Sequence, residues 1–364
     1  MALAIDERLR PTSRLTRILR RPELGALSGT VLIVIVFAVV AGHTGLFTSR
    51  GIVNVLQIAG ELGILACAVA LLMIGGEFDL SIGSTIGFAG VVIGMGVTVL
   101  HLPLWAAILI AFAFAVLIGY VNGILLIKTG LPSFIVTLAA MFILRGITLA
   151  VTRSVTGRTQ IPYITKDSGD AWYVEIFSGT ALQGLYRWLA SAGIIGMRPD
   201  GAPDVAGVPV SVIWWLVLTA IATWVLLNTR FGNWIFAAGG DPNAARNVGV
   251  PVGRVKIILF ILTALAGTLL ATIQVLSVGS ADTLRGTQKE FEAIIAAVIG
   301  GCLLTGGYGS AIGAAFGALI FGLVQMGIFY TGIDTDWFKV FLGSMVLIAV
   351  LFNNFVRRKA TEAK

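Results

Sequence analysis

Three polar residues share one face of an apolar segment near the start of the chain. Asn54, Gln57 and Glu61 follow one another at intervals of three and four residues, which aligns side chains along a helix. Amide and carboxylate groups can exchange hydrogen bonds with hydroxyl groups, and a carboxylate in a membrane can also carry a coupling ion. Because charge at membrane depth is costly, this stripe is predicted to face protein or a water-filled path.

Other polar residues stand alone in further apolar segments. Arg145 is the second ionisable residue expected within such a segment, and three amides are each isolated. For each amide, a hydrogen bond between helices and contact with a solute are equally compatible with the sequence. With the stripe, the amides form a candidate polar pathway: Asn54, Gln57, Glu61, Asn122, Gln274 and Gln325.

The segment "GGDPNAARNVGVPV", residues 239–252, is polar and contains strong signals for the start and the end of a helix. Asp241 is expected to be an N-cap and Pro242 the first residue of a short helix, which Gly249 and Pro251 end. Small alanines on one side and Arg246 on another suit a helix that docks against a protein partner. The segment carries no catalytic group.

The composition is that of a membrane protein. Of the 364 residues, 57% are hydrophobic and 12% are charged, whereas a soluble domain carries about a quarter charged residues. The net charge of +7 flanks apolar segments rather than forming a nucleic-acid footprint. Cys67 and Cys302 lie in or next to apolar segments, so neither a disulfide framework nor a metal site is expected.

Windows of about 20 apolar residues predict an all-α protein with ten transmembrane helices. The expected spans are 26–41, 52–74, 82–100, 104–127, 134–151, 210–227, 257–278, 291–304, 312–328 and 337–352. With both termini inside, the inner segments hold fifteen of the 25 Lys and Arg residues, which favours this orientation. The predicted organisation is an inner basic segment 1–25, a membrane domain 26–356 with a long outer loop 152–209 and an inner loop 228–256, and an inner tail 357–364.

Two segments resemble each other within the chain. "IGGEFDLSIGSTIG", residues 74–87, and "IGGCLLTGGYGSAIG", residues 299–313, both open with Ile-Gly-Gly and close with Gly-Ser-x-Ile-Gly. Internal repeats are common in membrane transporters. In the first segment, Asp79 or Ser81 is expected to cap the next helix or to shape the turn before it.

Several enzyme motifs are missing. The sequence contains no GxxxxGK[ST] phosphate loop, no HExxH and no GxSxG, and no paired carboxylates lie within its spans. The chain is therefore predicted not to be an enzyme and to hold neither ATP nor a metal of its own.

Two motifs together point to a known family. "NAARNVG", residues 243–249, resembles the E-A-A-x-x-x-G coupling loop of ATP-binding-cassette (ABC) importer permeases. "DLSIGS", residues 79–84, is similar to the DLS-x-G-S signature of the ribose, xylose, arabinose and galactoside branch of that superfamily, and the likeness extends over about 52–357. Asn243 departs from the usual Glu, Glu77 from a more frequent Gly, and the outer loop is long for this branch.

The resemblance implies a multi-pass permease subunit in a bacterial inner membrane, importing a monosaccharide or polyol. A separate cytoplasmic ABC ATPase would hold ATP, a periplasmic solute-binding protein would deliver the solute, and two identical or related permeases would pair. The implied ATPase coupling loop comprises Asp241, Asn243, Ala244, Ala245, Arg246 and Gly249, and the signature turn comprises Asp79, Ser81, Gly83 and Ser84. An arginine at position 245 is expected to clash in the docking groove.

Rival interpretations remain at this stage. An ion-coupled secondary transporter would use Glu61 and Arg145 as coupling charges, and a passive channel would need no energy source. Within the importer interpretation, branched-chain amino acids, nucleosides or a furanone-type signal are alternative solutes.

Overall fold

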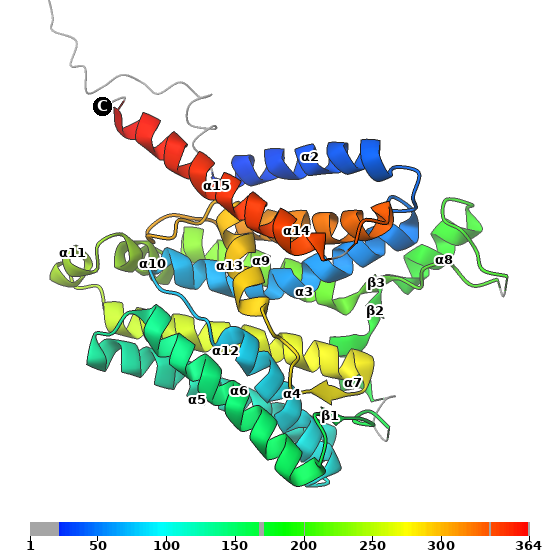
Figure 1. The fold of residues 1–364 in the computed structure, drawn as a ribbon, viewed down its shortest axis with the longest axis horizontal. Coiled ribbons are helices and arrows are strands. Elements are labelled where there is room, and N and C mark those ends of the chain that lie inside the picture. The colour runs from blue at the N-terminus through cyan, green and yellow to red at the C-terminus, as the bar shows by residue number, and fades with distance from the viewer. Residues whose placement is uncertain (1–21, 167–170, 200, 335, 363–364) are drawn as a thin grey trace, which may run out of the picture.

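The computed structural model describes residues 22–166, 171–199, 201–334 and 336–362, and it is mostly helical (Figure 1). Most of the predicted segment 1–25 and the end of the tail 357–364 lie outside these residues. The helices are α2 Pro22–Ala41, α3 Ser49–Ile74, α4 Ile82–Thr98, α5 Leu104–Thr129, α6 Ser133–Thr156, α7 Trp172–Ser178, α8 Gln183–Ser191, α9 Val210–Asn228, α10 Arg230–Gly240, α11 Pro242–Asn247, α12 Val252–Val278, α13 Lys289–Ile299, α14 Ala311–Thr331 and α15 Trp337–Glu362. Two antiparallel pairs of short strands join β1 (Gln160–Ile161) to β4 (Ala281–Asp282) and β2 (Thr180–Ala181) to β3 (Val208–Pro209).

Within the described residues, seven helices are long and apolar enough to cross a membrane: α2, α3, α5, α6, α9, α12 and α14. The expected count of ten spans is not confirmed. The span predicted at 82–100 is the 17-residue helix α4, and the one at 291–304 is the 11-residue helix α13. The last expected span falls in α15, whose apolar part is the shorter segment Trp337–Ile348.

Proline and glycine set the boundaries of the long helices. Helices α5 and α6 begin directly after Pro103 and Pro132, whose fixed φ angle suits the approach to a first turn. They end at Gly130 and Gly157, which have φ angles of 67° and 69°. Glycine adopts this left-handed conformation without the steric cost that other residues meet, so both helices stop sharply.

Helix α3 lies at the centre of the bundle. It packs against α9, α12, α13 and α14, and 78% of its most apolar window is buried, compared with 22% for α6. Small residues allow the close approach: Gly63 faces the indole ring of Trp215 on α9, and Gly322 of α14 faces the backbone at Val55 and Ala59. Many apolar side chains of α2, α5, α6 and α9 face outward, as expected of helices that contact lipid.

The molecule has two distinct ends. The long helices run between them, with α11 at one end and α8, β2 and β3 at the other (Figure 1). Helix α4 is about 25 Å long against about 39 Å for α5, by the rise per residue of an α-helix. The non-helical linker 75–81 connects the end of α3 to the start of α4.

The two resembling segments begin with the same glycine turn. Each begins where a helix ends, at Gly75 after α3 and at Gly300 after α13, with φ angles of −70° and −67°. The next glycine has a positive φ angle in both, 83° at Gly76 and 90° at Gly301. Each linker then leads through a serine N-cap into the next helix. The sequence likeness therefore corresponds to a repeated turn geometry.

Helix α14 crosses α13 at Gly317, where a methyl group would lie 1.9 Å from the carbonyl oxygen of Ala296. We expect Gly317→Val to destabilise the fold, because overpacking typically costs about 1–3 kcal/mol. The control is Gly146→Val on α6, where nothing lies within 4 Å. The apparent melting temperature of the purified protein should fall by at least about 2–4 °C for the first variant only. Equal shifts would contradict this packing.

Candidate functional site

Helix α11 forms as the sequence predicts. Oδ1 of Asp241 accepts hydrogen bonds from the backbone N–H groups of Asn243 and Ala244, at 2.9 and 3.0 Å. Pro242 occupies the first turn, and Gly249 follows the helix with a φ angle of 85°. The N-cap satisfies two N–H groups that would otherwise lack partners at the exposed helix end.

The exposed face of α11 differs from the one expected. Ala245 is 4% exposed and belongs to the main hydrophobic core with Ala238 of α10 and Val252 of α12. Ala245→Arg would therefore disrupt the packing of α11 on α10 and α12. The prediction that this substitution clashes in the docking groove of a partner is wrong, because Ala245 is buried within this chain. Ala244 is exposed, and Val248 at the helix end is 80% exposed.

Two polar residues complete that exposed face. Arg246 donates from Nη1 to Oδ1 of Asn243, at 3.3 Å, and both side chains are exposed. The residue that replaces the usual Glu therefore contacts Arg246. The exposed face of α11 is defined by Asn243, Ala244, Arg246 and Val248.

Asp79 in the signature turn is the centre of a buried hydrogen-bond network. Its carboxylate accepts from the backbone N–H and the hydroxyl of Ser81, at 2.8 and 2.6 Å, and from the hydroxyl of Thr263, at 2.7 Å. Asn122 donates from Nδ2 to Oγ of Ser81 at 2.9 Å. The network joins the turn before α4 to α5 and α12, and Asp79 is 1% exposed.

This network decides between the alternatives left open for Asp79, Ser81 and Asn122, and it adds one residue that the sequence did not indicate. Ser81 is the N-cap of α4 but makes no side-chain capping bond, so Asp79 and Ser81 shape the turn rather than cap the first free N–H groups. Asn122 belongs to the turn and not to the group around Glu61. Thr263 was missed, because one threonine in an apolar helix shows no distinguishing pattern.

The rest of the signature turn contacts α13. A side chain at Gly83 would lie 1.9 Å from Oε2 of Glu290, and Ser84 is buried with its hydroxyl unpaired among the described residues.

The linker before α4 is also anchored, because Glu77 pairs with Lys256 of α12 and Ser133 accepts the N–H of Phe78 at 3.1 Å. The linker is therefore held from three sides.

Glu61 is the centre of a second polar group. Its Oε2 accepts from Nε2 of Gln274 at 2.8 Å, and its Oε1 accepts from Nε2 of Gln57 at 3.4 Å. Burial lowers the pKa of Arg285, and the carboxylates of Asp282 and Glu61 act in the opposite direction. Gln57 is exposed although α3 is otherwise largely buried, so this group opens to one side of the central helix.

Among the described residues, no hydrogen bond joins Asn54 or Gln325 to the Glu61 group. Asn54 is half-buried one turn before Gln57 on α3. Gln325 of α14 has a buried Oε1 without a hydrogen-bond partner among the described residues. The group around Glu61 therefore contains Gln57 and Gln274 from the predicted set, together with Arg285.

Charged residues around the start of α13 were missed from the sequence. Glu290 is 1% exposed and faces Arg145 of α6 at 3.7 Å, so the arginine is matched by an opposite charge. Lys289 pairs with Glu292 at 2.5 Å. The sequence predicts an apolar span beginning at 291, but Glu290, just before it, packs against Gly83 of α4 and Arg145 of α6. Their placement depends on the fold and not on local periodicity.

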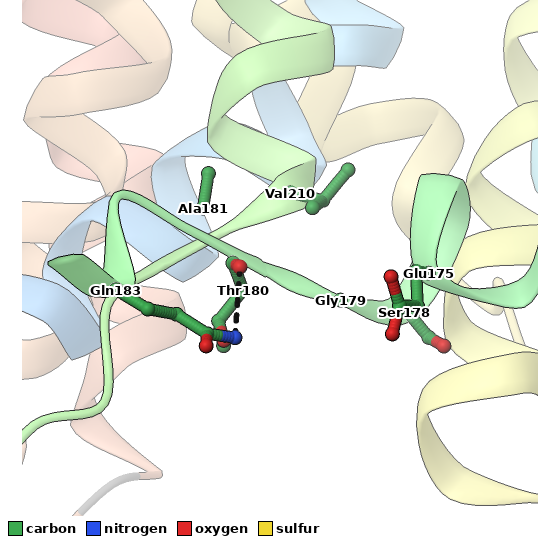
Figure 2. A pocket seen from close by; sticks show the side chains of 7 residues that line it. All are labelled: Glu175, Ser178, Gly179, Thr180, Ala181, Gln183 and Val210. Carbon is green, nitrogen blue, oxygen red and sulfur yellow. Dashed lines mark hydrogen bonds between the residues drawn. The ribbon is translucent and has the colours of Figure 1, made fainter. Parts of the chain in front are cut away.

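The outer loop forms a small cavity at the end of the molecule opposite α11. It measures about 370 Å³, lies between α7, the β2 strand and the start of α9, and is shown in Figure 2. The lining residues are Glu175, Ser178, Gly179, Thr180, Ala181, Gln183 and Val210. Gln183 donates to the hydroxyl of Thr180 at 2.8 Å, and the carboxylate of Glu175 lies at the other side. Two short helices in this loop, α7 and α8, carry the exposed Trp172 and Trp188.

The long apolar helices, the polar group on the central helix and the punctuated helix α11 define an integral membrane transport protein. Residues 51–350 match the family described as "Branched-chain amino acid transport system / permease component". The chain belongs to this family. This agrees with the resemblance found in the sequence and with a transport component rather than an enzyme.

Similar curated proteins span nearly the whole chain. The ribose import permease protein RbsC of Escherichia coli K12 is 30% identical over 324 residues, covering 89% of this chain and 91% of that protein. The xylose transport system permease protein XylH of the same strain is 30% identical, with 86% and 87% covered. The probable ABC transporter permease protein YphD, also from that strain, is 30% identical, with 94% and 92% covered.

The Asp79 network can be tested through Thr263. Thr263→Val removes one donor to a buried carboxylate, which costs about 1–3 kcal/mol, so the apparent melting temperature should fall. The matched control is Thr272→Val on the same helix, since Thr272 is also buried and donates only to the carbonyl of Thr268. Equal melting temperatures for the two variants would contradict the network.

Proposed function

We propose that this chain is the permease subunit of an ABC-type importer, which moves a monosaccharide or close polyol inward using ATP hydrolysed on a separate subunit. The observation that carries the proposal is the exposed face of α11. The Asp241 cap and the buried Ala245 fix the helix in place, and Val248 is an apolar tip that is 80% exposed among the described residues. The names of the relatives support the solute class, since two of these proteins are a ribose and a xylose permease.

The orientation follows from charge. With α11 and both termini on the cytoplasmic side of an inner membrane, the short loops obey the positive-inside rule. The short helices α4 and α13 and the apolar first part of α15, Trp337–Ile348, would complete ten membrane segments. Two copies, identical or related, would form the pathway, and the α8 end would face the periplasm.

The polar group around Glu61 suits a solute rich in hydroxyl groups. It combines carboxylate acceptors with the amide donors of Gln57 and Gln274. A sugar hydroxyl can donate and accept at once, so it can bridge such groups as it passes. We place Asn54 and Gln325 along the same route.

The cavity at the outer end suits contact with a solute-binding protein. Its carboxylate, hydroxyl and amide groups could receive a cationic side chain from that partner. The exposed Trp172 and Trp188 provide apolar contact area beside it.

An ion-coupled secondary transporter is the second candidate, because Glu61 is a half-buried carboxylate on a membrane helix. Arg145 supports this candidate less, since Glu290 faces it. The energy source separates the two. Uptake that persists when ATP is depleted and stops when the proton or sodium gradient collapses would establish the secondary transporter.

Docking of the ATPase can be tested at Val248. Val248→Asp places a charge on the exposed tip of α11, which should reduce the ATPase that co-purifies in mild detergent at least tenfold while the permease stays monodisperse. The control is Leu131→Asp, the same kind of change at an exposed residue between α5 and α6. Undiminished ATPase with Val248→Asp would refute docking at α11.

The pathway can be tested at Glu61. Glu61→Gln should reduce uptake of a labelled pentose by about tenfold or more, because a hydrogen bond to a charged group contributes about 1.5–3 kcal/mol. The co-purified ATPase should be unchanged. Asp334→Asn, in an exposed loop, removes a charge without affecting the pathway. Normal uptake of pentoses, hexoses and polyols by Glu61→Gln would exclude Glu61 from the route.

A further inference from the structure

Helix α10 ends in a close backbone contact with both repeated turns. A side chain at Gly239 would lie 1.8 Å from the carbonyl oxygen of Ile74, at the end of α3, and 2.7 Å from the nitrogen of Gly307, in the linker after α13. Both distances are far shorter than any real contact of a side-chain carbon. Only glycine therefore fits at position 239 without moving one of the two turns.

The two turns also contact each other at this place. The N–H of Gly307 donates to the carbonyl of Ile74 at 2.8 Å, and a side chain at Gly306 would lie 2.7 Å from the Cα of Gly76. Gly76, Gly306 and Gly307 have φ angles of 83°, 79° and 74°. We call Gly76, Gly239, Gly306 and Gly307 the glycine junction.

The glycine junction lies directly beside α11. Asp241, the N-cap of α11, follows Gly240 at the end of α10, and its N–H donates to the carbonyl of Ala237 at 3.2 Å. On the other side, the linker 75–81 leads to Asp79 and α4, and the linker 300–310 joins α13 to α14. No flexible side chain stands between α10 and either linker at the contact.

We propose that Gly239 is a positioning residue for energy coupling, through which a movement of α11 reaches α4 and α13 together. Backbone atoms in direct contact cannot absorb a displacement by changing rotamer, so a shift of α10 displaces both linkers. The buried Ile235 and Ala238, both 0% exposed, keep α10 attached to the core as this occurs. This inference rests on the proposed function, because it takes α11 as the docking helix.

The test compares adjacent glycines in the complete complex with its ATPase and binding protein. In Gly239→Ala, the methyl group separates α10 from the turns, whereas in Gly240→Ala it meets nothing within 4 Å. Three quantities are measured: co-purified ATPase, ATP hydrolysis with and without solute-loaded binding protein, and uptake. For Gly239→Ala we expect normal ATPase binding and basal hydrolysis, at least tenfold lower uptake, and no stimulation by the binding protein. Gly240→Ala should match the unmodified chain throughout.

The outcomes separate this inference from the proposed function. Equal uptake by the two variants overturns the inference, and so does loss of the ATPase from Gly239→Ala, which would mean that the residue supports docking. If the unmodified chain itself co-purifies no ATPase, the proposed function fails instead.

A second pair decides the matter if Gly239→Ala does not fold. Gly76→Ala brings a methyl group 3.2 Å from the Cα of Gly239, and Gly130→Ala imposes similar backbone strain, at a φ angle of 67°, with nothing within 4 Å. If ATP hydrolysis is no longer stimulated by the binding protein in Gly76→Ala but is still stimulated in Gly130→Ala, the result supports transmission of the movement of α11 through the glycine junction. Equal behaviour of this pair overturns it.

Discussion

A lipid bilayer offers no hydrogen-bond partners, and this constraint shapes the rest of the molecule. Non-helical backbone and charged groups at membrane depth must find partners within the protein. The linker 75–81 meets the requirement through Asp79, which accepts three hydrogen bonds, and through the pairing of Glu77 with Lys256. Asn122 of α5 and Ser133 of α6 also bond to this linker, so α5, α6 and α12 together fix it relative to much of the bundle. The short helix α4 can therefore begin well within the length of its neighbours.

The same constraint separates two kinds of polar group. The network around Asp79 is closed, since its members are buried and bond mainly to one another. The group around Glu61 is open, because Gln57 is exposed and Glu61 is only half-buried. A closed network holds helices in place, whereas an open one has hydrogen-bonding capacity left for a solute. This contrast is the basis on which we propose the Glu61 group, and not the Asp79 network, for the pathway.

Local features of the fold were predictable from the sequence, whereas features that join distant segments were not. The cap of α11 and the face shared by Gln57 and Glu61 follow from spacing along one helix, and both were predicted. Thr263 lies 184 residues from Asp79, whose carboxylate it bonds, so no local pattern in the sequence indicates this hydrogen bond. The inward position of Ala245 likewise depends on α10 and α12. The count of ten spans was not confirmed because α4 and α13 are shorter than their hydropathy windows imply.

Helix α11 keeps its anchor and its outward face on different residues. Ala245 packs the helix against the core of the protein, whereas Ala244, Arg246 and Val248 are exposed and do not contribute to this packing. The outward face can therefore diverge during evolution without cost to folding. On the docking that we propose for α11, changes at these few positions after a gene duplication would be enough to prevent one importer from binding the ATPase of the other. In a cell with many related permeases, such changes would keep each permease paired with its own ATPase.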